Sequence, residues 1–147
     1  VLASGPFIEG WAVYGERVMV DAGYLNGDPL MRLIQLKWYL RTIVNALLDQ
    51  AVHVDGMERA AAMKLMTEAG FQEEREAAGK WVRAQLSSAQ LPVYFVGAQE
   101  HFALRREAEQ RLGARFSLHD YHDRLLSYGS PPLRFARALM FDLPIER

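Results

Sequence analysis

The stretch from Asp28 to His53 carries the longest helical pattern in the sequence. Asp28 is a good N-cap residue, and Pro29 follows at the first helical position, where a missing N–H costs nothing. Apolar side chains then recur at helical spacing, and they are Leu33, Leu36, Leu40, Ile43, Val44, Leu47, Leu48 and Ala51. The pattern predicts a helix about 37 Å long, around which the remaining chain must pack.

Shorter helical patterns, separated by breaks rich in Gly, Pro and Asp, fill the rest of the chain. They predict a helix from Ser4–Pro6 to about Tyr24, helices at 57–69, 72–86, 93–112 and 119–127, and a last one ending near Phe141. No run of alternating apolar residues is long enough to predict a strand. We therefore expect an all-α protein of about seven helices, forming one domain over residues 1–147 around a long central helix.

The composition excludes several kinds of protein. Half of the 147 residues are hydrophobic, which is enough for one core, and the net charge is only −1, from 17 Lys and Arg against 18 Asp and Glu. This balance gives no field that would attract nucleic acid. The chain has no Cys, so disulfides and thiolate metal ligands are excluded. No apolar run approaches the roughly 18 residues of a membrane span, and the compartment stays undetermined.

The segment FIEGWAVYGE, residues 7–16, places Glu9 in an almost wholly apolar run. Glu9 and Glu16 share one stripe of the predicted helix, and apolar residues surround that stripe, so we expect both carboxylates to be buried. A buried carboxylate needs a cation or a metal as its partner. The pattern leaves two interpretations of Glu9 open, an internal salt bridge to Arg or Lys and a metal ligand.

A polar row runs along the long helix at four-residue intervals, formed by Lys37, Arg41, Asn45, Asp49 and His53. Its simplest interpretation is a solvated face. However, Trp38 and Tyr39 lie on the same side, where a surface that meets only water would not need them. The row also ends in His53, and histidine is the side chain most often used to move protons near neutral pH. A functional face is therefore the alternative.

Two further groups have both a structural and a chemical interpretation. His119 and His122 lie three apart on the helix that Ser117 is expected to cap, a spacing that suits helix packing or, alternatively, a metal site. Tyr94 follows the break at 87–92. It is either a core tyrosine with a bonded hydroxyl or a donor to a developing oxyanion.

Several motifs, in order along the whole chain, resemble one family. FIEGWAVYGE resembles the F-x-E-G-W-A-x-Y-x-E signature of the bacterial domain-of-unknown-function 885 proteins. DQAVH at 49–53 matches the outer residues of their D-T-G-L-H motif, and Gln90, Tyr94 and Gly97 match Q-A-x-x-Y-x-x-G. The stretch 104–133 matches their ending, L-R-x-x-A…L-G-x-x-F-x-L-x-x-F-H-D-x-L-L-x-x-G-x-x-P-L.

The resemblance implies a helical zinc metallopeptidase, related in plan to the thimet-type oligopeptidases. It makes Glu9 the third protein ligand of a catalytic zinc, beside two His of an H-E-x-x-x-x-H-H-like helix. It also makes His53 and Tyr94 the candidates for holding the substrate and stabilising the tetrahedral oxyanion.

The chain departs from the family at three places. It contains no H-E-x-x-H, a motif that precedes the E-G-W-A helix in the family, and its four His are His53, His101, His119 and His122. Lys80 stands where the family usually has Glu in E-V-x-R-Y, although Arg83 is kept. Ser88 and Ala89 replace the usual Pro-Gly before Gln90.

We therefore expect the C-terminal portion of a zinc-dependent metallopeptidase-like hydrolase, which acts on a peptide substrate in the complete protein. The isolated chain should be inactive and bind no zinc tightly, because Glu9 is one ligand where catalytic zinc needs about three. An uncovered apolar face should make it a homo-oligomer in isolation. The alternative is a standalone helical domain for interaction or dimerisation, in which Glu9 would pair with a cation such as Arg41 or Arg83.

Overall fold

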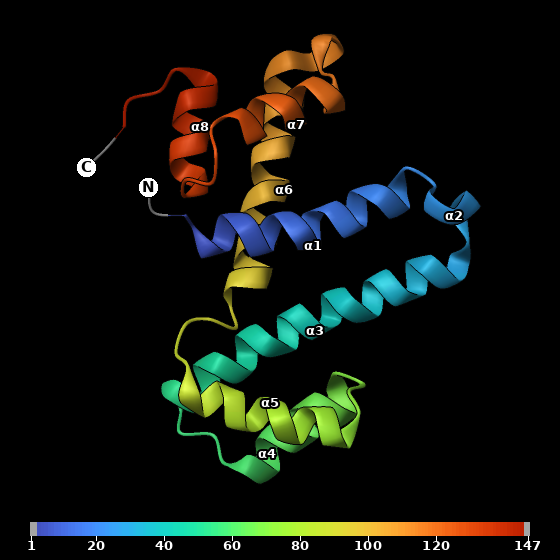
Figure 1. Cartoon of the computed structure of the whole chain (residues 1–147), viewed down its shortest axis with the longest axis vertical. Helices are drawn as coiled ribbons and strands as arrows, with labels where there is room; N and C mark the ends of the chain where they lie inside the picture. The colour runs from blue at the N-terminus through green and yellow to red at the C-terminus, as the bar shows by residue number, and fades with distance from the viewer. Residues whose placement is uncertain (1–2, 146–147) are drawn as a thin grey trace. The chain divides into compact units, whose positions relative to one another are not determined.

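A computed structural model describes residues 3–145, and this part of the chain contains helices and no strand (Figure 1). The predicted all-α class is therefore confirmed. The elements, in order, are α1 (Gly5–Asp21), α2 (Tyr24–Gly27), α3 (Pro29–His53), α4 (Arg59–Lys64), the π-helical turn η1 (Leu65–Ala69), α5 (Glu74–Leu86), α6 (Val93–Leu112), the 3-10 turn η2 (Gly113–Arg115), α7 (Leu118–Ser127) and α8 (Leu133–Phe141).

The helices predicted from the sequence are present, and the differences lie at their ends. The first helix stops at Asp21 rather than near Tyr24, and the one-turn element α2 follows it. Leu25 and Asn26 in α2 have left-handed φ angles of 52° and 60°, so this turn reverses the chain instead of extending α1. The helix predicted at 57–69 begins at Arg59, and its last turn widens to π-helical hydrogen bonding in η1.

Two predicted helix caps are confirmed. The backbone N–H of Leu30 donates to Oδ1 of Asp28 at 2.8 Å, and Pro29 occupies the first position of α3. The N–H of Asp120 donates to Oγ of Ser117 at 3.3 Å. Each cap satisfies a backbone donor that the first turn of a helix leaves without a partner, and so fixes where the helix begins.

Contacts between backbone segments divide the chain into two compact units. The first unit comprises Val1–Tyr14 and Val96–Arg147, and the second comprises Gly15–Phe95. The boundary falls inside α1 and inside α6. The prediction of one domain is not tested by this division, and each unit is described below by itself.

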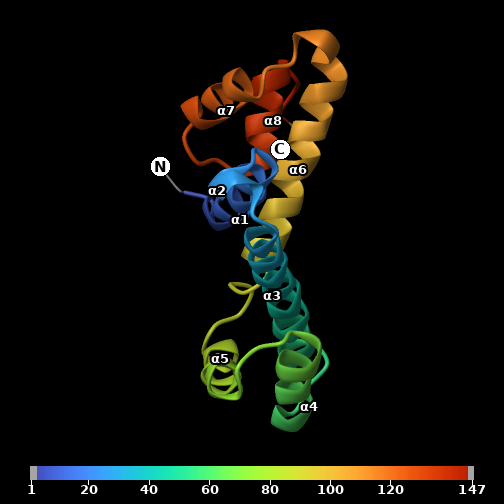
Figure 2. The same ribbon diagram turned by 90° about the vertical axis from the view of Figure 1, so that its right-hand side faces the viewer.

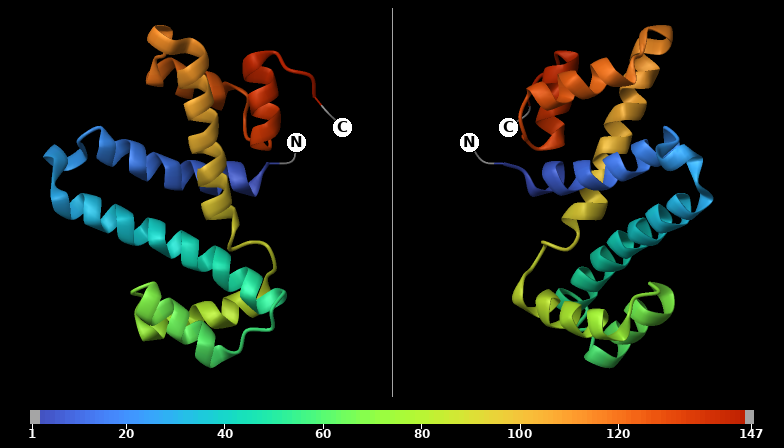
Figure 3. Two further views of the ribbon diagram at one scale, coloured as in Figure 1. Left: turned by 180° about the vertical axis from the view of Figure 1, so that it is seen from behind. Right: turned by 45° about the vertical axis from the view of Figure 1, so that its right-hand side comes forward.

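The first unit has its core between the start of α1 and helices α6, α7 and α8. Figures 1 and 3 show α7 and α8 lying beside α6. The buried core side chains are Phe7, Leu104, Ala108, Tyr121, Leu125, Leu133, Ala136 and Met140. Helices α7 and α8 are amphipathic, and burying their apolar faces in this core stabilises the unit.

The second unit has its core near the C-terminal end of α3, where α5 and η1 contact that helix and α4 contacts α5 (Figure 2). Its buried side chains are Val44, Leu48, Ala62, Met66, Ala77, Ala84 and Leu91. This core thus covers the second half of the long helix. This part of α3 carries Asp49 and His53.

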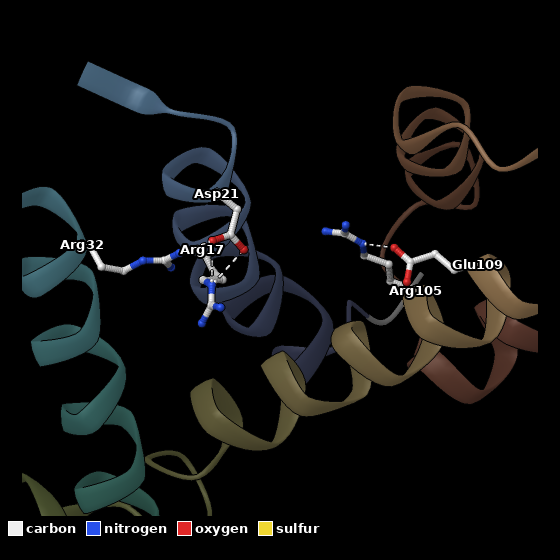
Figure 4. A network of polar contacts seen from close by, with 5 residues as sticks. All are labelled: Arg17, Asp21, Arg32, Arg105 and Glu109. Carbon is white, nitrogen blue, oxygen red and sulfur yellow. Dashed lines mark hydrogen bonds and ion pairs between the residues drawn. The ribbon is translucent and has the colours of Figure 1, made fainter. Parts of the chain in front are cut away.

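The last turns of α1 and the first turns of α3 are joined by a charge network in the second unit. Asp21 accepts two hydrogen bonds from Arg17 Nε, at 2.9 and 3.0 Å, and one from Arg32 Nη2 at 2.5 Å (Figure 4). The two guanidinium groups hold the pKa of Asp21 below its usual range against the opposing effect of burial. Large apolar side chains are exposed on α2 and the first half of α3, namely Tyr24, Leu25, Leu30, Leu33, Ile34, Leu36 and Trp38. Between residues 3 and 145, no helix is long and apolar enough to span a bilayer.

Candidate functional site

Glu9 lies on α1 directly beside the place where α1 and α6 touch. A Cβ atom added to Gly10 would lie 2.2 Å from the carbonyl carbon of Gly97, and one added to Gly97 would lie 1.9 Å from the carbonyl oxygen of Pro6. No side chain fits at either position, so the glycines permit direct backbone contact. This contact positions the turn of α1 that carries Glu9.

The Glu9 carboxylate is half-buried, and within the described part of its unit it has no ion pair and no hydrogen bond. The two cations proposed as partners in a standalone domain are engaged elsewhere: Arg41 pairs with Glu76, and Arg83 donates to Gln90. Glu16, by contrast, is exposed, so the expected burial of the second acid was wrong. Glu16 lies two turns further along α1, in the part of that helix that belongs to the second unit.

A buried imidazole, that of His101, is hydrogen-bonded to the first turn of α1. His101 is fully buried on α6, and its Nε2–H donates to the carbonyl oxygen of Phe7 at 2.9 Å. The ring also packs edge-on against Phe7 and Trp11, with centroid distances of 5.0 and 5.6 Å. Burial lowers the pKa of His101, so the ring is held in its neutral form. No role for His101 could be predicted from the sequence, because the burial of a single polar residue is not visible in a sequence pattern.

A second imidazole, that of His122, connects the stretch 104–133 to the segment 7–16. Nε2 of His122 on α7 lies 2.7 Å from the hydroxyl of Tyr14 on α1. Burial, followed by the charge of Arg105, lowers the pKa of His122, while burial raises the pKa of Tyr14. Arg105 is held in turn by Glu109, at 2.8 Å (Figure 4). The neutral imidazole therefore accepts the Tyr14 O–H.

His119 and His122 do not form a joint site. His119 is exposed, and its Nδ1 lies 3.3 Å from Asp120 and 3.6 Å from Asp123, whereas His122 contacts the aromatic cluster. Across residues 3–145, no group of three His, Asp or Glu side chains is arranged to hold a metal ion. Of the two interpretations of this pair, helix packing therefore fits His122.

In the second unit, Asp49 and His53 sit on the covered half of α3. Asp49 is only 5% exposed, and Asn45 is buried too, so the solvated-face interpretation of the polar row is wrong for these residues. Oδ1 of Asp49 accepts the backbone N–H of Ala89 at 3.1 Å, which ties the loop at 87–92 to α3. Oδ2 of Asp49 has no hydrogen-bond partner among the described residues.

His53 is exposed at the end of α3 and caps a neighbouring helix. Its Nε2 lies 2.9 Å from the carbonyl oxygen of Ala84 and 3.0 Å from that of Ser87. Both partners are acceptors, so Nε2 must carry the proton and donate. The imidazole thereby satisfies carbonyl groups at the C-terminal end of α5. Nδ1 is the ring atom that remains for other contacts.

Tyr94 ends a short chain of hydrogen bonds between motif residues. Arg83 Nη2 donates to Gln90 Oε1 at 2.7 Å, and Gln90 Nε2 lies 3.4 Å from the Tyr94 hydroxyl oxygen. The guanidinium group orients the Gln90 amide, because an arginine can only donate. The amide nitrogen therefore faces the phenol oxygen, and the Tyr94 O–H proton is left to donate elsewhere.

The structure thus brings His53 and Tyr94 into one unit, with the loop at 87–92 linked by hydrogen bonds to both, and places Glu9 in the other unit. From the family resemblance we also expect Glu9, His53 and Tyr94 to converge on one cleft in the complete protein, and this convergence stays a prediction. Sequence reasoning missed Asp49 as the anchor of this loop, although its place in the D-x-x-x-H motif was the available signal.

A family profile described as "Bacterial protein of unknown function (DUF885)" matches residues 1–140. The chain belongs to this DUF885 family. It is similar to a "putative lipoprotein of unknown function" from Shewanella oneidensis, with 45% identity, a TM-score of 0.91, and coverage of 95% of this chain and 26% of that chain. It is also similar to a "putative lipoprotein" from Colwellia psychrerythraea, with 28% identity, a TM-score of 0.87, and coverage of 90% of this chain and 23% of that chain.

These two structures are much longer than the part that matches. The chain spans about a quarter of the length of each. A search of curated proteins gave no match.

Proposed function

We propose that this DUF885 chain is the C-terminal portion of a zinc-dependent metallopeptidase-like hydrolase, in which Glu9 is a zinc ligand. The observation that carries the proposal is the half-buried Glu9 carboxylate without a partner in its unit, held in place by the Gly10–Gly97 contact. A partly desolvated carboxylate is costly unless a cation neutralises it. A salt bridge would have met this need, and the cations considered for it pair with other groups.

The group implied here fits the residue present, since a carboxylate with free oxygens is a usual ligand of zinc in hydrolases. Zinc bound by two imidazoles and this carboxylate would supply an activated water. The two imidazoles would come from an H-E-x-x-x-x-H-H-like helix outside this sequence, so the isolated chain should be inactive and retain no stoichiometric zinc on dialysis.

His53 and Tyr94 would act on the peptide substrate. The Tyr94 O–H proton is left to donate by the contact with Gln90, as an oxyanion donor requires. His53 donates from Nε2 to the end of α5, so it could bind a developing negative charge only through a protonated Nδ1. Its role is therefore that of an imidazolium donor or of a Nδ1 acceptor for a substrate N–H.

The deciding experiment uses the full-length protein with zinc measured by elemental analysis. Glu9→Gln should remove the zinc while the circular dichroism spectrum stays unchanged, because the amide is a weak ligand of the same shape. Glu100→Gln, at an exposed position on α6 of the same unit, should keep it. Stoichiometric zinc in purified Glu9→Gln would rule out the ligand assignment.

The substrate roles need a separate measurement. Tyr94→Phe should lower turnover of a peptide substrate by about 10²–10³-fold, as loss of one oxyanion donor does, and leave the zinc content unchanged. His53→Gln keeps a side-chain N–H for the α5 carbonyls but loses the imidazole. It should therefore lose activity without losing thermal stability. If Tyr94→Phe retains full turnover, Tyr94 is a packing residue.

A further inference from the structure

A polar pocket in the second unit lies apart from the residues assigned above. It has a volume of about 270 Å³ and lies between α3, the turn after η1 and the start of α5. Its lining is Ile34, Lys37, Trp38, Arg41, Gly70, Gln72 and Glu76. The pocket therefore combines an indole ring and an aliphatic side chain with groups that donate hydrogen bonds.

Gln72 presents a buried donor without an acceptor. The residue is only 8% exposed, and its Oε1 accepts from the ammonium group of Lys80 at 2.9 Å. An ammonium group has donors only, so this contact fixes which end of the amide is oxygen. Nε2 is then the free end, and it has no hydrogen-bond partner among the described residues. A Cβ added to Gly70 would lie 3.1 Å from this nitrogen, which places it beside a residue of the pocket wall.

The charges around the pocket favour an anion. Arg41 packs 4.8 Å over the Trp38 ring and pairs with Glu76, so these two charges compensate each other. Lys37 has no ion pair within the described part of its unit, and it contributes one uncompensated positive charge. Lys80 lies behind Gln72 and is only 7% exposed. Burial and the nearby charge of Arg41 lower the pKa of Lys80 to about 8, although Glu76, 3.7 Å from its ammonium group, opposes them.

We propose that this pocket binds a carboxylate carried on a short aliphatic chain. The Nε2–H of Gln72 and the ammonium group of Lys37 would donate to the two oxygens, and Trp38 and Ile34 would contact the aliphatic part. The indole ring and the aliphatic side chain of the lining suit an aliphatic carboxylate better than inorganic phosphate. The same chemistry is offered by a free organic acid, by a Glu side chain in a peptide and by a peptide carboxyl terminus. The inference does not depend on zinc or on the roles of Glu9, His53 and Tyr94.

The direct test is a titration of the ¹⁵N-labelled chain observed by NMR. Sodium butyrate should shift the Gln72 side-chain NH₂ signals and the Trp38 indole signal in a saturable way. A blocked tripeptide with a central Glu should bind at least ten-fold tighter than the same peptide with a central Gln. A third tripeptide, neutral but with a free carboxyl terminus, distinguishes a terminus from a side chain as the source of the carboxylate.

Two variants locate the binding. Gln72→Glu keeps an oxygen that accepts from Lys80, and so preserves the fold. It replaces the free N–H donor by a second oxygen, so binding should be lost. Lys37→Met should weaken binding about ten-fold. Lys64→Met, at an exposed position on α4, is the matched control and should bind as the wild type does.

Three results would overturn the proposal. The first is the absence of saturable shifts at Gln72 and Trp38 with any of the carboxylates. The second is equal binding of all three tripeptides, or unchanged binding by Gln72→Glu. The third is equally tight binding of sodium phosphate or sulfate, which would make the pocket a general anion site.

Discussion

The hydroxyl of Tyr14 lies 2.7 Å from Nε2 of His122, and this bond joins the first signature of the family to its last. Tyr14 is five residues beyond Glu9 on α1, and His122 comes from α7, so the bond ties the glutamate helix to the C-terminal core. His101 adds a second tie, through the carbonyl oxygen of Phe7. Both imidazoles serve this purpose in their neutral forms.

The first unit should therefore lose stability in mild acid. Burial lowers the pKa values of His101 and His122 below the ordinary 6.5, so the unfolded chain takes up protons first as the pH falls. The stability that the neutral rings provide is fully present above pH 6.5 and is lost as the pH falls through 6.5 towards the folded-state pKa values. Each extra proton bound on unfolding changes the free energy by about 1.4 kcal/mol per pH unit.

Urea unfolding between pH 7.5 and pH 5 measures this loss. His101→Phe preserves the aromatic packing and should make the dependence on pH shallower. His119→Gln removes an exposed imidazole on α7 and should leave the dependence unchanged. A His101→Phe curve parallel to that of the wild type would contradict the assignment.

A second prediction concerns the contact beside Glu9. Gly10→Ala or Gly97→Ala would push the α1 and α6 backbones apart, since the added methyl group would lie about 2 Å from backbone atoms. Overpacking of this kind costs about 3 kcal/mol or more when the backbone must move. Gly15→Ala is the control on the same helix, because nothing lies within 4 Å of its Cβ position. It should raise the free energy of unfolding by about 0.5–1 kcal/mol. Equal effects of Gly10→Ala and Gly15→Ala would show that the backbones are not in contact.

The helices could be predicted because their signals are local. The Asp28 and Ser117 caps and the spacing of apolar residues determine where α3 and α7 begin, and neither depends on a distant part of the chain. The conversion of the third helix to a π-helical turn at Leu65–Ala69 had no such local signal. It depends on how α4 packs, which a sequence pattern does not contain.

The candidate site could be predicted in its residue types but not in its contacts. Glu9, His53 and Tyr94 were found through resemblance, and their roles stay proposals. Which nitrogen of His53 is used depends on carbonyl groups 31 and 34 residues away, at Ala84 and Ser87. The expected burial of Glu16 failed because a helical stripe gives the direction of a side chain but not whether another element covers it. Contacts between distant segments determine both the nitrogen that His53 uses and the exposure of Glu16.

A third prediction explains one departure from the family. Ala89 has a left-handed φ of 60°, at the position where the family usually has Gly. An L-residue in this conformation costs roughly 1–2 kcal/mol, and Gly avoids that cost at the expense of some chain entropy. Ala89→Gly should therefore stabilise the chain by about 0.5–1 kcal/mol and keep the N–H that donates to Asp49. The control Ala61→Gly, at an exposed position inside α4, should destabilise it by about 1 kcal/mol. A loss of stability in Ala89→Gly, measured by urea unfolding, would contradict the conformation.

The last prediction concerns alkaline pH and Lys80. Burial, and then the charge of Arg41, lower its pKa in the folded chain from 10.5 to about 8, although Glu76 opposes them. Between pH 8 and pH 10.5 the unfolded chain keeps the proton and the folded chain does not, so the contribution of Lys80 to stability rises with pH in this window. The difference in pKa corresponds to a gain of about 3 kcal/mol across the window. Lys80→Met has no such group. In urea unfolding, the free energy of unfolding of the wild type relative to this variant should therefore rise by about 3 kcal/mol from pH 8 to pH 10.5. Lys64→Met, which removes an exposed ammonium group, should follow the wild type at every pH. Parallel curves for the wild type and Lys80→Met would show that the buried ammonium group keeps its ordinary pKa.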